Sequence, residues 1–426
     1  MKFGTTLGGA DAAQVEARAS KKLDLTSALS WRPESEKFRL MAGALLALSV
    51  AYGCVYLAVC AAKGWSLGFG DSFALWSWGR FLGDHPAAAI YDAAILHSGQ
   101  LALGLDPGAS YPFAYPPSFL LVLWPLGQLP GPIALAVLIA VTLPLYLWAT
   151  VGRNWWSLAL VAAIAAPTTT IGIVAGQSSF LSAALLAGGV RLAASNPVLG
   201  GLLLGLLTYK PQLGLLVPVA LIAARLWRTI AVAALTALLL IVVTTMLFGG
   251  PIWPDWAIAL PAFWRQFAVE NSTILHLMPT VFATLRQFGF APAYAQLAQL
   301  AATAVAAAAV WVLFRSGPGP LAGAGLLVAA LLATPYVFVY DMPFLATAVI
   351  WFVAERRQAG EAFATGEVLL MAFAMISPIA LVAGTSRFPL ALLSLALLLG
   401  AIVRRDQRSG RRAKTIKSPQ FYCSLH

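Results

Sequence analysis

Charged residues are scarce in this 426-residue chain, where aspartate, glutamate, lysine and arginine make up only 10% of the total. Soluble globular proteins carry roughly 25% of such residues. Hydrophobic residues make up 60% of the chain, and many gather in runs close to the roughly 20 residues that a membrane-spanning helix needs. The composition therefore excludes a soluble enzyme and predicts an all-α polytopic membrane protein with about 12 transmembrane helices.

Several kinds of site are also missing from the sequence. The three cysteines, Cys54, Cys60 and Cys423, offer neither a disulfide framework nor the spacing of metal ligands. His85 and His97 have no paired ligand partner, so we expect no metal and no other cofactor. A glycine-rich phosphate loop of the Walker type is absent as well, which argues against ATP-driven transport.

The net charge of +11 at pH 7 is carried mainly by two tails and by short gaps between apolar runs. The positive-inside rule produces this distribution, so we favour membrane orientation over nucleic-acid binding as its cause. Residues 1–37 lack the apolar core of a signal peptide, which predicts a cytoplasmic N-terminal tail. Residues 38–403 form the predicted multispanning domain, and the basic residues of 404–426 predict a cytoplasmic tail that binds anionic membrane lipids. We expect a multi-pass protein of the bacterial inner (plasma) membrane with both termini in the cytoplasm.

Two stretches between the apolar runs are too polar to span a bilayer, yet they are rich in aromatic residues. Because the N-terminus is expected in the cytoplasm and residues 38–62 are the first span, the loop at about 63–115 is expected on the extracytoplasmic side. The loop at 250–292 is expected on the same side, where it would cover a site in the first loop.

The first loop predicts two short helices. Residues 71–82 read as an interfacial helix whose aromatic side chains Phe73, Trp76 and Trp78 suit the lipid headgroup level. Residues 87–103 predict the second helix, after a break at Asp84-His85-Pro86.

The remaining apolar stretches predict the other spans. They are 116–129, 131–150, 156–174, 178–194, 197–209, 211–225, 229–249, 293–315, 319–337, 341–354, 364–383 and 386–403. An even number of crossings must precede Arg225 and Arg228 if both are cytoplasmic. Seven candidate stretches, counted from 38–62 to 211–225, precede these arginines, and seven is an odd number. One segment within 156–194 is therefore expected to be a half-helix or re-entrant, so that 156–194 makes a single net crossing.

Asp71 is the favoured catalytic residue. A carboxylate at the membrane surface can take a proton from an acceptor hydroxyl as the oxygen of that hydroxyl attacks. An aspartate at the start of a helix also serves as an N-cap, and the two roles do not exclude each other.

Lys210 lies between two apolar runs, and a lysine at membrane depth is costly enough to mark a functional site. Its natural ligand is a phosphate, although a lysine that snorkels to the interface is the simpler alternative. Arg80 is a candidate for a second phosphate contact, since guanidinium groups bind phosphate bidentately. An ordinary surface arginine is an equally good interpretation of Arg80.

Four further polar residues are candidates for substrate binding. Asp92 and Asp341 would accept hydrogen bonds from sugar hydroxyls, and Tyr115 is placed with them in the candidate substrate site. Gln177 follows Gly176 between two apolar stretches, where its amide would bond either a ligand or a neighbouring helix.

The order of several short motifs resembles glycosyltransferase family 87, the polyprenol-phosphate-mannose-dependent mannosyltransferases of the multispanning GT-C fold. The motifs are Asp71-Ser72-Phe73, Trp78-Gly79-Arg80-Phe81-Leu82-Gly83, Ile90-Tyr91-Asp92, Phe113-Ala114-Tyr115-Pro116-Pro117 with Pro125-Leu126, Gly176-Gln177 and Lys210-Pro211-Gln212. The resemblance covers roughly residues 38–350, and the motifs are specific together rather than singly.

The resemblance implies an enzyme that transfers a hexose, usually mannose, from a polyprenyl-phosphate donor to an extracytoplasmic glycan or glycolipid acceptor. In GT-C enzymes an acidic residue of the first extracytoplasmic loop is generally the base, which corresponds to Asp71 here. Inversion at the anomeric carbon and independence of metals are common in that fold. Ser72 stands where the resemblance leads us to expect an aromatic residue directly after the aspartate, so Asp84 and Asp92 remain alternative bases.

A flippase or other transporter of lipid-linked glycans is the main alternative, and an assembly subunit without catalysis is a weaker one. Transporters place their ligand groups near the membrane midplane, often in repeated halves of the chain. The sequence shows no convincing internal repeat, and its polar residues gather in the loops. Both observations favour an enzyme.

Overall fold

The computed structural model describes residues 36–62, 71–152, 158–267, 274–361, 363–383 and 388–417. Within these ranges every regular element is helical, in agreement with the expected fold class. Most of the predicted N-terminal tail and the end of the C-terminal tail lie outside the described residues, and so do parts of the two long loops.

Five helices of the described chain are long and apolar enough to cross a membrane. They are α3 (Glu36–Ala62), α7 (Gly131–Val151), α14 (Trp227–Phe248), α17 (Pro292–Phe314) and α20 (Thr365–Ala383). A sixth results if α8 (Leu158–Ala165) and α9 (Pro167–Ala175), which are bent by 50° relative to each other, form one broken span. Pro167 causes the bend, because a proline disfavours helical geometry at the residue before it, and Ala166 is extended.

The bend lies within 156–194, where a half-helix or re-entrant segment and one net crossing were expected. After the bend, Gly176 lies against Ser72 of the first loop, whereas Arg191 near the end of α10 (Ser179–Leu192) lies against Gly152 at the end of α7. These contacts indicate that α8–α9 and α10 run in opposite directions rather than making a single crossing.

The other helices of the bundle are shorter. They are η2 (Pro117–Phe119), α6 (Leu120–Gly127), α10 (Ser179–Leu192), α11 (Pro197–Leu206), η3 (Leu207–Tyr209), α12 (Pro211–Gly214), α13 (Val217–Ala223), α18 (Pro320–Ala333), η6 (Val339–Asp341), α19 (Pro343–Gln358) and α21 (Leu390–Lys417). Many of them begin at a proline, whose missing N–H has no helical partner in the first turn. Proline therefore divides this hydrophobic chain into short helices that are separated by breaks in the regular backbone.

Several boundaries differ from the sequence-based expectation, and two of the differences affect the neighbourhood of Asp341 and the basic tail. The helix expected over 319–337 ends at Ala333, because Thr334 and Phe338 have extended backbones. The last helix was expected to end at residue 403 but continues to Lys417, so the first part of the basic tail is helical.

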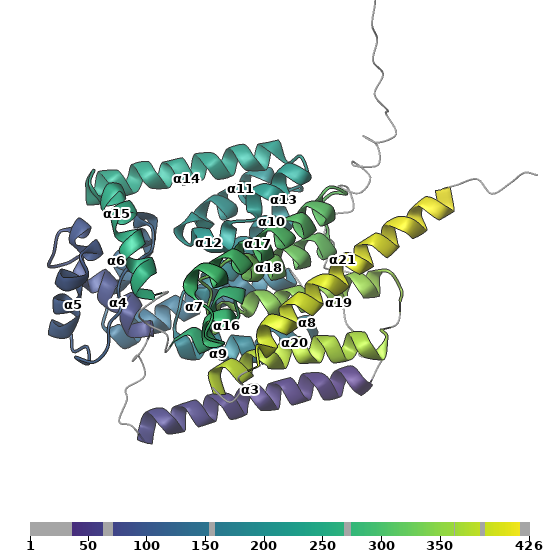
Figure 1. The fold of residues 1–426 in the computed structure, drawn as a ribbon, viewed down its shortest axis with the longest axis horizontal. Coiled ribbons are helices and arrows are strands. Elements are labelled where there is room, and N and C mark those ends of the chain that lie inside the picture. Colours follow the sequence, from purple (N-terminus) through teal and green to yellow (C-terminus); the bar gives the residue numbers. More distant parts are fainter. Residues whose placement is uncertain are drawn as a thin grey trace, which may run out of the picture.

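Burial separates the inner helices from the outer ones. Helices α10, α18 and α19 are buried along nearly their whole length. Helix α14 instead exposes large apolar side chains such as Leu235, Leu238 and Met246, and it runs along one edge of the molecule (Figure 1). An apolar outer surface around a buried helical centre is what an integral membrane protein requires, and the long apolar helices indicate a multi-pass protein.

Glycine allows the outer helix α14 to approach the bundle closely. A Cβ at Gly201 of α11 would lie 2.6 Å from the Val232 side chain of α14. A Cβ at Gly205, one turn further on, would lie 2.5 Å from Thr236. Small residues four apart bring two membrane helices into backbone contact, so these glycines fix the position of α14.

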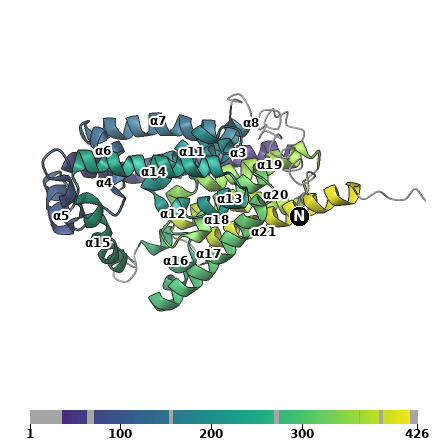
Figure 2. The same cartoon turned by 90° about the horizontal axis from the view of Figure 1, so that it is seen from above.

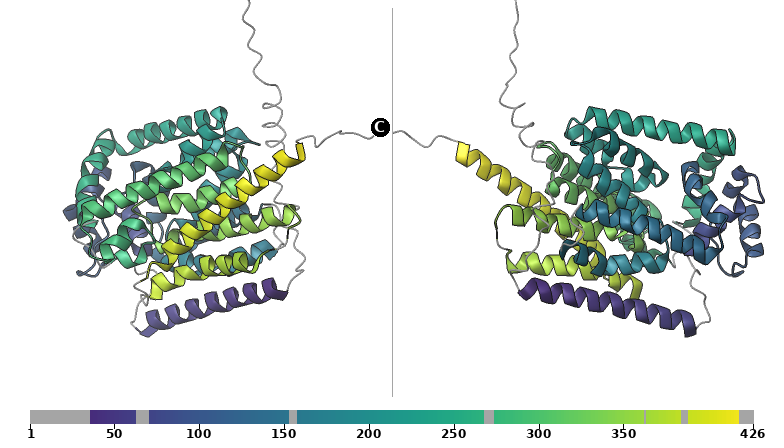
Figure 3. Two further views of the ribbon diagram at one scale, coloured as in Figure 1. Left: turned by 45° about the vertical axis from the view of Figure 1, so that its right-hand side comes forward. Right: turned by 180° about the vertical axis from the view of Figure 1, so that it is seen from behind.

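The segments of the two long loops gather at one end of the long helices (Figures 1 and 2). These segments are α4 (Asp71–Phe81), η1 (Ala87–Tyr91), α5 (Ala93–Ala102) and α15 (Ile252–Arg265), and the second loop continues through η5 (Leu275–Leu277) and α16 (Val281–Gln287). The helix expected over 87–103 is divided into η1 and α5, because Asp92 between them is extended and caps α5. The basic end of α21 projects from the opposite end of the bundle (Figure 3).

Ion pairs connect the helices at that opposite end. Arg356 of α19 pairs with Glu361 at 2.8 Å and with Glu367 of α20 at 2.7 Å. Arg405 of α21 pairs with Glu355 at 3.2 Å and also with Glu361. The two arginines thus join α19, α20 and α21, and both of them pair with Glu361.

Candidate active site

The candidate site is assembled at breaks between helices rather than on continuous helix surfaces. Asp71 begins α4, Gln177 lies between α9 and α10, Lys210 lies between η3 and α12, and Asp341 ends η6. A break frees a side chain from the regular spacing of a helix, so residues from several helices can meet there. Proline or glycine borders these breaks, which is why this sequence forms them there.

Gly176 brings the beginning of α4 against the break between α9 and α10. Its φ of 61° lies in the left-handed region that favours glycine. A Cβ at Gly176 would also lie 2.6 Å from the Cβ of Ser72 and 2.7 Å from Leu135. Gly176 thus leaves room for α4 to pack against this break, and Gln177 beside it lowers the pKa of Asp71.

Lys210 and Asp341 form a buried ion pair. The Nζ atom of Lys210 lies 2.6 Å from Oδ1 of Asp341, and each side chain is only 2% exposed. Oδ2 of Asp341 accepts a hydrogen bond from the backbone N–H of Phe338 at 3.3 Å. The ring of Tyr340 lies beside the ammonium, with its centroid 5.5 Å from Nζ, a cation–π contact. Lys210 therefore does not snorkel to the surface but is held inside the bundle.

Asp71 lies within the electrostatic reach of this pair. The pKa of Asp71 is raised to about 6, and burial is the largest cause. The positive charge of Lys210 and the hydrogen bond with Gln177 lower the pKa, whereas the negative charge of Asp341 raises it. The structure thus brings together Asp71, Gln177, Lys210 and Asp341, residues that lie far apart in the chain. A carboxyl group with a pKa near 6 is ionised at neutral pH and is a stronger base than an ordinary aspartate.

Three tyrosines surround the charged residues. Burial raises the pKa of Tyr115, and the charges of Asp341 and Asp71 raise it further. The pKa values of Tyr336 and Tyr340 are raised well above the ordinary value by burial and by the same two carboxylates. All three hydroxyls are therefore protonated at neutral pH and available as hydrogen-bond donors.

Tyr336 and Tyr340 were not expected from the sequence. The alternation of aromatic and valine residues in Tyr336-Val337-Phe338-Val339-Tyr340, directly before Asp341, was the available signal. Alternation of this kind predicts an extended segment with aromatic rings on one side; in the structure Phe338 is extended, and η6 begins at Val339. The rings of Phe338 and Tyr340 stack at 5.1 Å, and Phe267 packs against Tyr336 at 4.7 Å.

A second aromatic series leads from the first loop to the neighbourhood of Lys210. The ring centroids of Trp78 and Tyr115 are 5.7 Å apart, those of Tyr115 and Phe119 are 4.8 Å apart, and Phe119 stacks on Tyr209 at 4.6 Å. Trp78 is 5% exposed, and its indole donates a hydrogen bond to the backbone oxygen of Tyr111. The expectation that Trp78 anchors the loop at the lipid headgroups was therefore wrong, because the ring packs inside the protein.

Close backbone contact holds α4, and with it Asp71, against α6. A Cβ at Gly79 would lie 2.0 Å from the backbone oxygen of Leu123, and a Cβ at Gly127 would lie 2.0 Å from the backbone of Gly79. The indole of Trp76 donates a hydrogen bond to the backbone oxygen of Leu129 at 2.9 Å. The first loop is thus fixed to the bundle.

The second loop packs on the first. The indole of Trp256 in α15 donates a hydrogen bond to the backbone oxygen of Ala114 at 3.1 Å. Phe263 of the same helix packs against Tyr336 at 5.7 Å. Helix α15 therefore contacts Tyr336 and the backbone next to Tyr115.

Two of the expected site residues lie elsewhere. Arg80 is 39% exposed, and its nearest carboxylate is that of Asp84 at 3.6 Å. Asp92 is exposed and caps α5, where its carboxylate accepts hydrogen bonds from the backbone N–H groups of Ala94 and Ile95. The alternative bases Asp84 and Asp92 thus lie on the surface of the first loop and outside the charged cluster.

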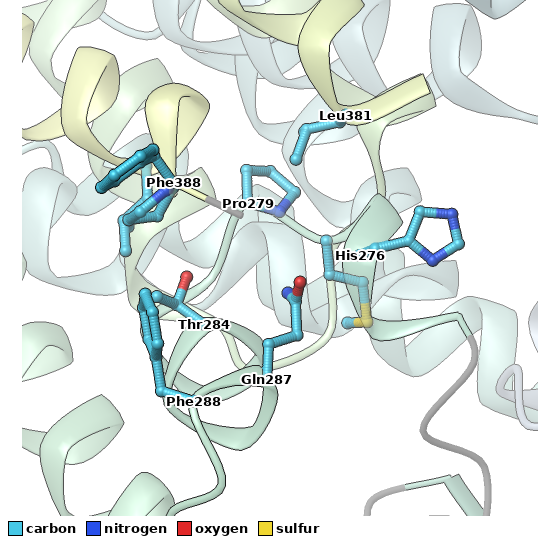
Figure 4. Close-up of a pocket in the computed structure, with 10 residues that line it drawn as sticks. His276, Pro279, Thr284, Gln287, Phe288, Leu381 and Phe388 are labelled. Atoms are coloured by element: carbon cyan, nitrogen blue, oxygen red, sulfur yellow. The ribbon is translucent and has the colours of Figure 1, made fainter. Parts of the chain in front are cut away.

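A surface depression lies apart from this cluster, between α16 and the junction of α20 with α21 (Figure 4). Its lining is mainly apolar and contains His276 but no carboxylate. Figure 4 shows the imidazole of His276 pointing away from the other labelled side chains. The described residues that line this depression therefore lack the carboxylates and the lysine that the charged cluster brings together.

The model of glycosyltransferase family 87 matches residues 113–338, more than half of the chain. The chain belongs to glycosyltransferase family 87. Tyr115, Gln177 and Lys210 lie within the matched residues of this glycosyltransferase, whereas Asp71 and Asp341 lie outside them. The comparisons with curated proteins and with solved structures each gave no match. Family membership shows an enzyme of membrane glycosyl transfer, with a sugar donor and an acceptor as its substrates.

Proposed function

We propose that this glycosyltransferase transfers a hexose from a polyprenyl-phosphate donor to an extracytoplasmic glycan or glycolipid acceptor. Mannose is the favoured hexose. The observation that carries the proposal is the cluster in which Asp71, a base with a pKa of about 6, lies within the electrostatic reach of Lys210, whose ammonium is buried against Asp341. A base and a fixed cation are the two groups that this transfer needs. Family membership supports the reaction class.

In the proposed mechanism, ionised Asp71 accepts the proton of the acceptor hydroxyl as its oxygen attacks the anomeric carbon. The bond between this carbon and the phosphate oxygen breaks, and its electron pair stays with the phosphate. Lys210 stabilises the negative charge that develops on the leaving phosphate. Tyr115 and Gln177 are proposed to hydrogen-bond the sugar, and the apolar faces between the helices accept the polyprenyl chain.

We further propose a GT-C-like bundle in residues 38–403, in which the shorter apolar helices complete about 12 transmembrane segments. The first loop and the second loop lie on the extracytoplasmic side, and both termini lie in the cytoplasm of a bacterial inner membrane. The contacts of α15 with Ala114 and Tyr336 support the second loop as a cover of the site.

The test uses purified full-length protein in lipid nanodiscs. Polyprenyl-phosphate-mannose, the corresponding glucose and arabinose lipids and a nucleotide-linked mannose are supplied with candidate acceptors, and sugar transfer is measured. We expect transfer from a polyprenyl-linked sugar and a loss of about 10²–10⁴-fold in kcat for Asp71→Asn, the usual contribution of a general base. Equal turnover by Asp71→Asn would exclude Asp71 as the base. Movement of the intact lipid-linked sugar across vesicles, without transfer, would instead indicate a flippase.

A further inference from the structure

The lysine proposed to bind phosphate already has a negatively charged partner. Among the described residues, the one hydrogen bond of the Lys210 ammonium goes to Asp341. An ammonium group has three N–H donors, so two donors remain available for a ligand. The carboxylate of Asp341 also keeps its position through the backbone N–H of Phe338.

Stability alone does not account for this arrangement. A buried ion pair pays a desolvation cost close to its Coulombic gain, so apolar replacements are often equally stable. Asp341 also raises the pKa of the nearby Asp71, which is a further cost to ionised groups in the cluster. A second carboxylate beside a phosphate-binding lysine therefore calls for a role in the reaction.

We propose, on the basis of the transferase function above, that Asp341 is a positioning residue that competes with phosphate for Lys210 and thereby promotes release of the polyprenyl phosphate product. The donor is a phosphodiester with one negative charge. When the bond to the sugar breaks, the phosphate keeps the electron pair and becomes a monoester with up to two negative charges at neutral pH. The acceptor proton is then on Asp71, which loses its own negative charge, so Asp341 is the carboxylate of the cluster that still opposes the phosphate.

A dianion held by a desolvated lysine would leave slowly, because charge-assisted contacts are strong away from water. Asp341 opposes this in two ways: it repels the dianion more than the monoanion, and it offers Lys210 another anion. The donor, with its single charge, meets less repulsion. Asp341 thus makes the site favour the substrate over the product.

The test measures binding of undecaprenyl phosphate to full-length protein in nanodiscs, by tryptophan fluorescence and as product inhibition of transfer. For Asp341→Asn we expect binding to be about tenfold tighter or more, because one opposing charge is removed from the desolvated site. Product inhibition by undecaprenyl phosphate should strengthen by the same factor. The donor KM should fall because the donor meets less repulsion, and kcat should fall because the product leaves more slowly. Asp341→Glu, which restores the charge, should recover the wild-type values. Unchanged or weaker binding of undecaprenyl phosphate to folded Asp341→Asn overturns the proposal.

A second measurement needs only the wild-type protein, in case Asp341→Asn does not fold. Undecaprenyl phosphate is compared with its methyl diester, which carries one charge. We expect the monoester to bind no tighter than the diester, and a tenfold preference for the monoester would contradict the role of Asp341. If the wild-type protein transfers no sugar from any lipid donor, the transferase proposal fails, while both binding measurements still decide whether Asp341 competes with phosphate for Lys210.

Discussion

Asp71 combines a raised pKa with a position within the electrostatic reach of a cation and a second carboxylate. Burial and the charge of Asp341 raise its pKa, whereas Lys210 and Gln177 oppose them. The pH dependence of the enzyme should therefore depend on each of these three neighbours.

We expect kcat/KM to rise as the pH increases through about 6, where Asp71 loses its proton, and then to reach a plateau. Asp341→Asn should move this rise to lower pH, since it removes a charge that holds the proton on Asp71. Measurements of transfer at subsaturating donor across the weakly acidic to neutral range test both expectations. A rise that stays at the same pH in Asp341→Asn would show that Asp341 does not act on the base.

The raised pKa also implies that ionised Asp71 destabilises the folded protein. The folded state holds the proton of Asp71 more tightly than the unfolded state does. Protonation of Asp71 therefore adds to the free energy of unfolding at pH values below the usual pKa of aspartate. This contribution is lost as the pH rises through about 6. Asp71→Asn should thus be more stable than wild type at about pH 8, by up to about 3 kcal/mol, and this advantage should shrink at about pH 5. Thermal unfolding in detergent at the two pH values provides the measurement.

The substitution Lys210→Gln tests the phosphate contact. Donor KM should rise about 10- to 100-fold, because a charged hydrogen bond contributes roughly 1.5–3 kcal/mol, while acceptor KM should change less. Arg80→Gln is the matched comparison, since Arg80 is partly exposed and faces Asp84. A surface ion pair contributes about 0–1 kcal/mol, so its effect should be small. A larger donor effect for Arg80→Gln than for Lys210→Gln would reverse the assignment.

At the scale of elements, the α4–α6 contact should control the position of Asp71. A Cβ at Gly79 would overlap the backbone oxygen of Leu123, and backbone atoms cannot move aside as a side chain can. Gly79→Ala should lower stability by about 1–3 kcal/mol and reduce kcat. Gly400→Ala in α21 is the control, because a Cβ at Gly400 would have no neighbour within 4 Å in the described chain; thermal unfolding and transfer rates of the two variants are compared. Equal behaviour of both variants would contradict a tight α4–α6 contact.

Much of the helix arrangement could be predicted from apolar runs bounded by proline and glycine, such as α7 and α14. The division of 87–103 was missed because Asp92 is both a helix-capping residue and a plausible ligand, and only its hydrogen bonds to Ala94 and Ile95 decide which role it has. The pairing of Lys210 with Asp341 could not be predicted either, because it depends on packing between breaks 131 positions apart.

At the scale of the whole molecule, the two ends of the bundle should face opposite sides of the membrane. After replacement of the native cysteines by alanine, Ser110→Cys in the first loop should react with a membrane-impermeant maleimide in intact cells. Ala359→Cys, at the end of α19 near the arginine–glutamate ion pairs, should react only after the membrane is permeabilised. Both positions are exposed, so access to the reagent is limited by the membrane alone. Labelling of both in intact cells would contradict the proposed orientation.

The ion pair of the candidate site, Lys210 with Asp341, also has a consequence for biosynthesis. Lys210 leaves the ribosome 131 residues before Asp341, a delay on the order of ten seconds at ordinary translation speeds. During this interval the lysine enters the membrane without its counterion. Insertion of the α11–α12 hairpin must therefore wait, or Lys210 must remain at the water interface, until Asp341 has been made. The candidate site is thus completed only late in synthesis, and a chain truncated before η6, and so without Asp341, should have no transferase activity.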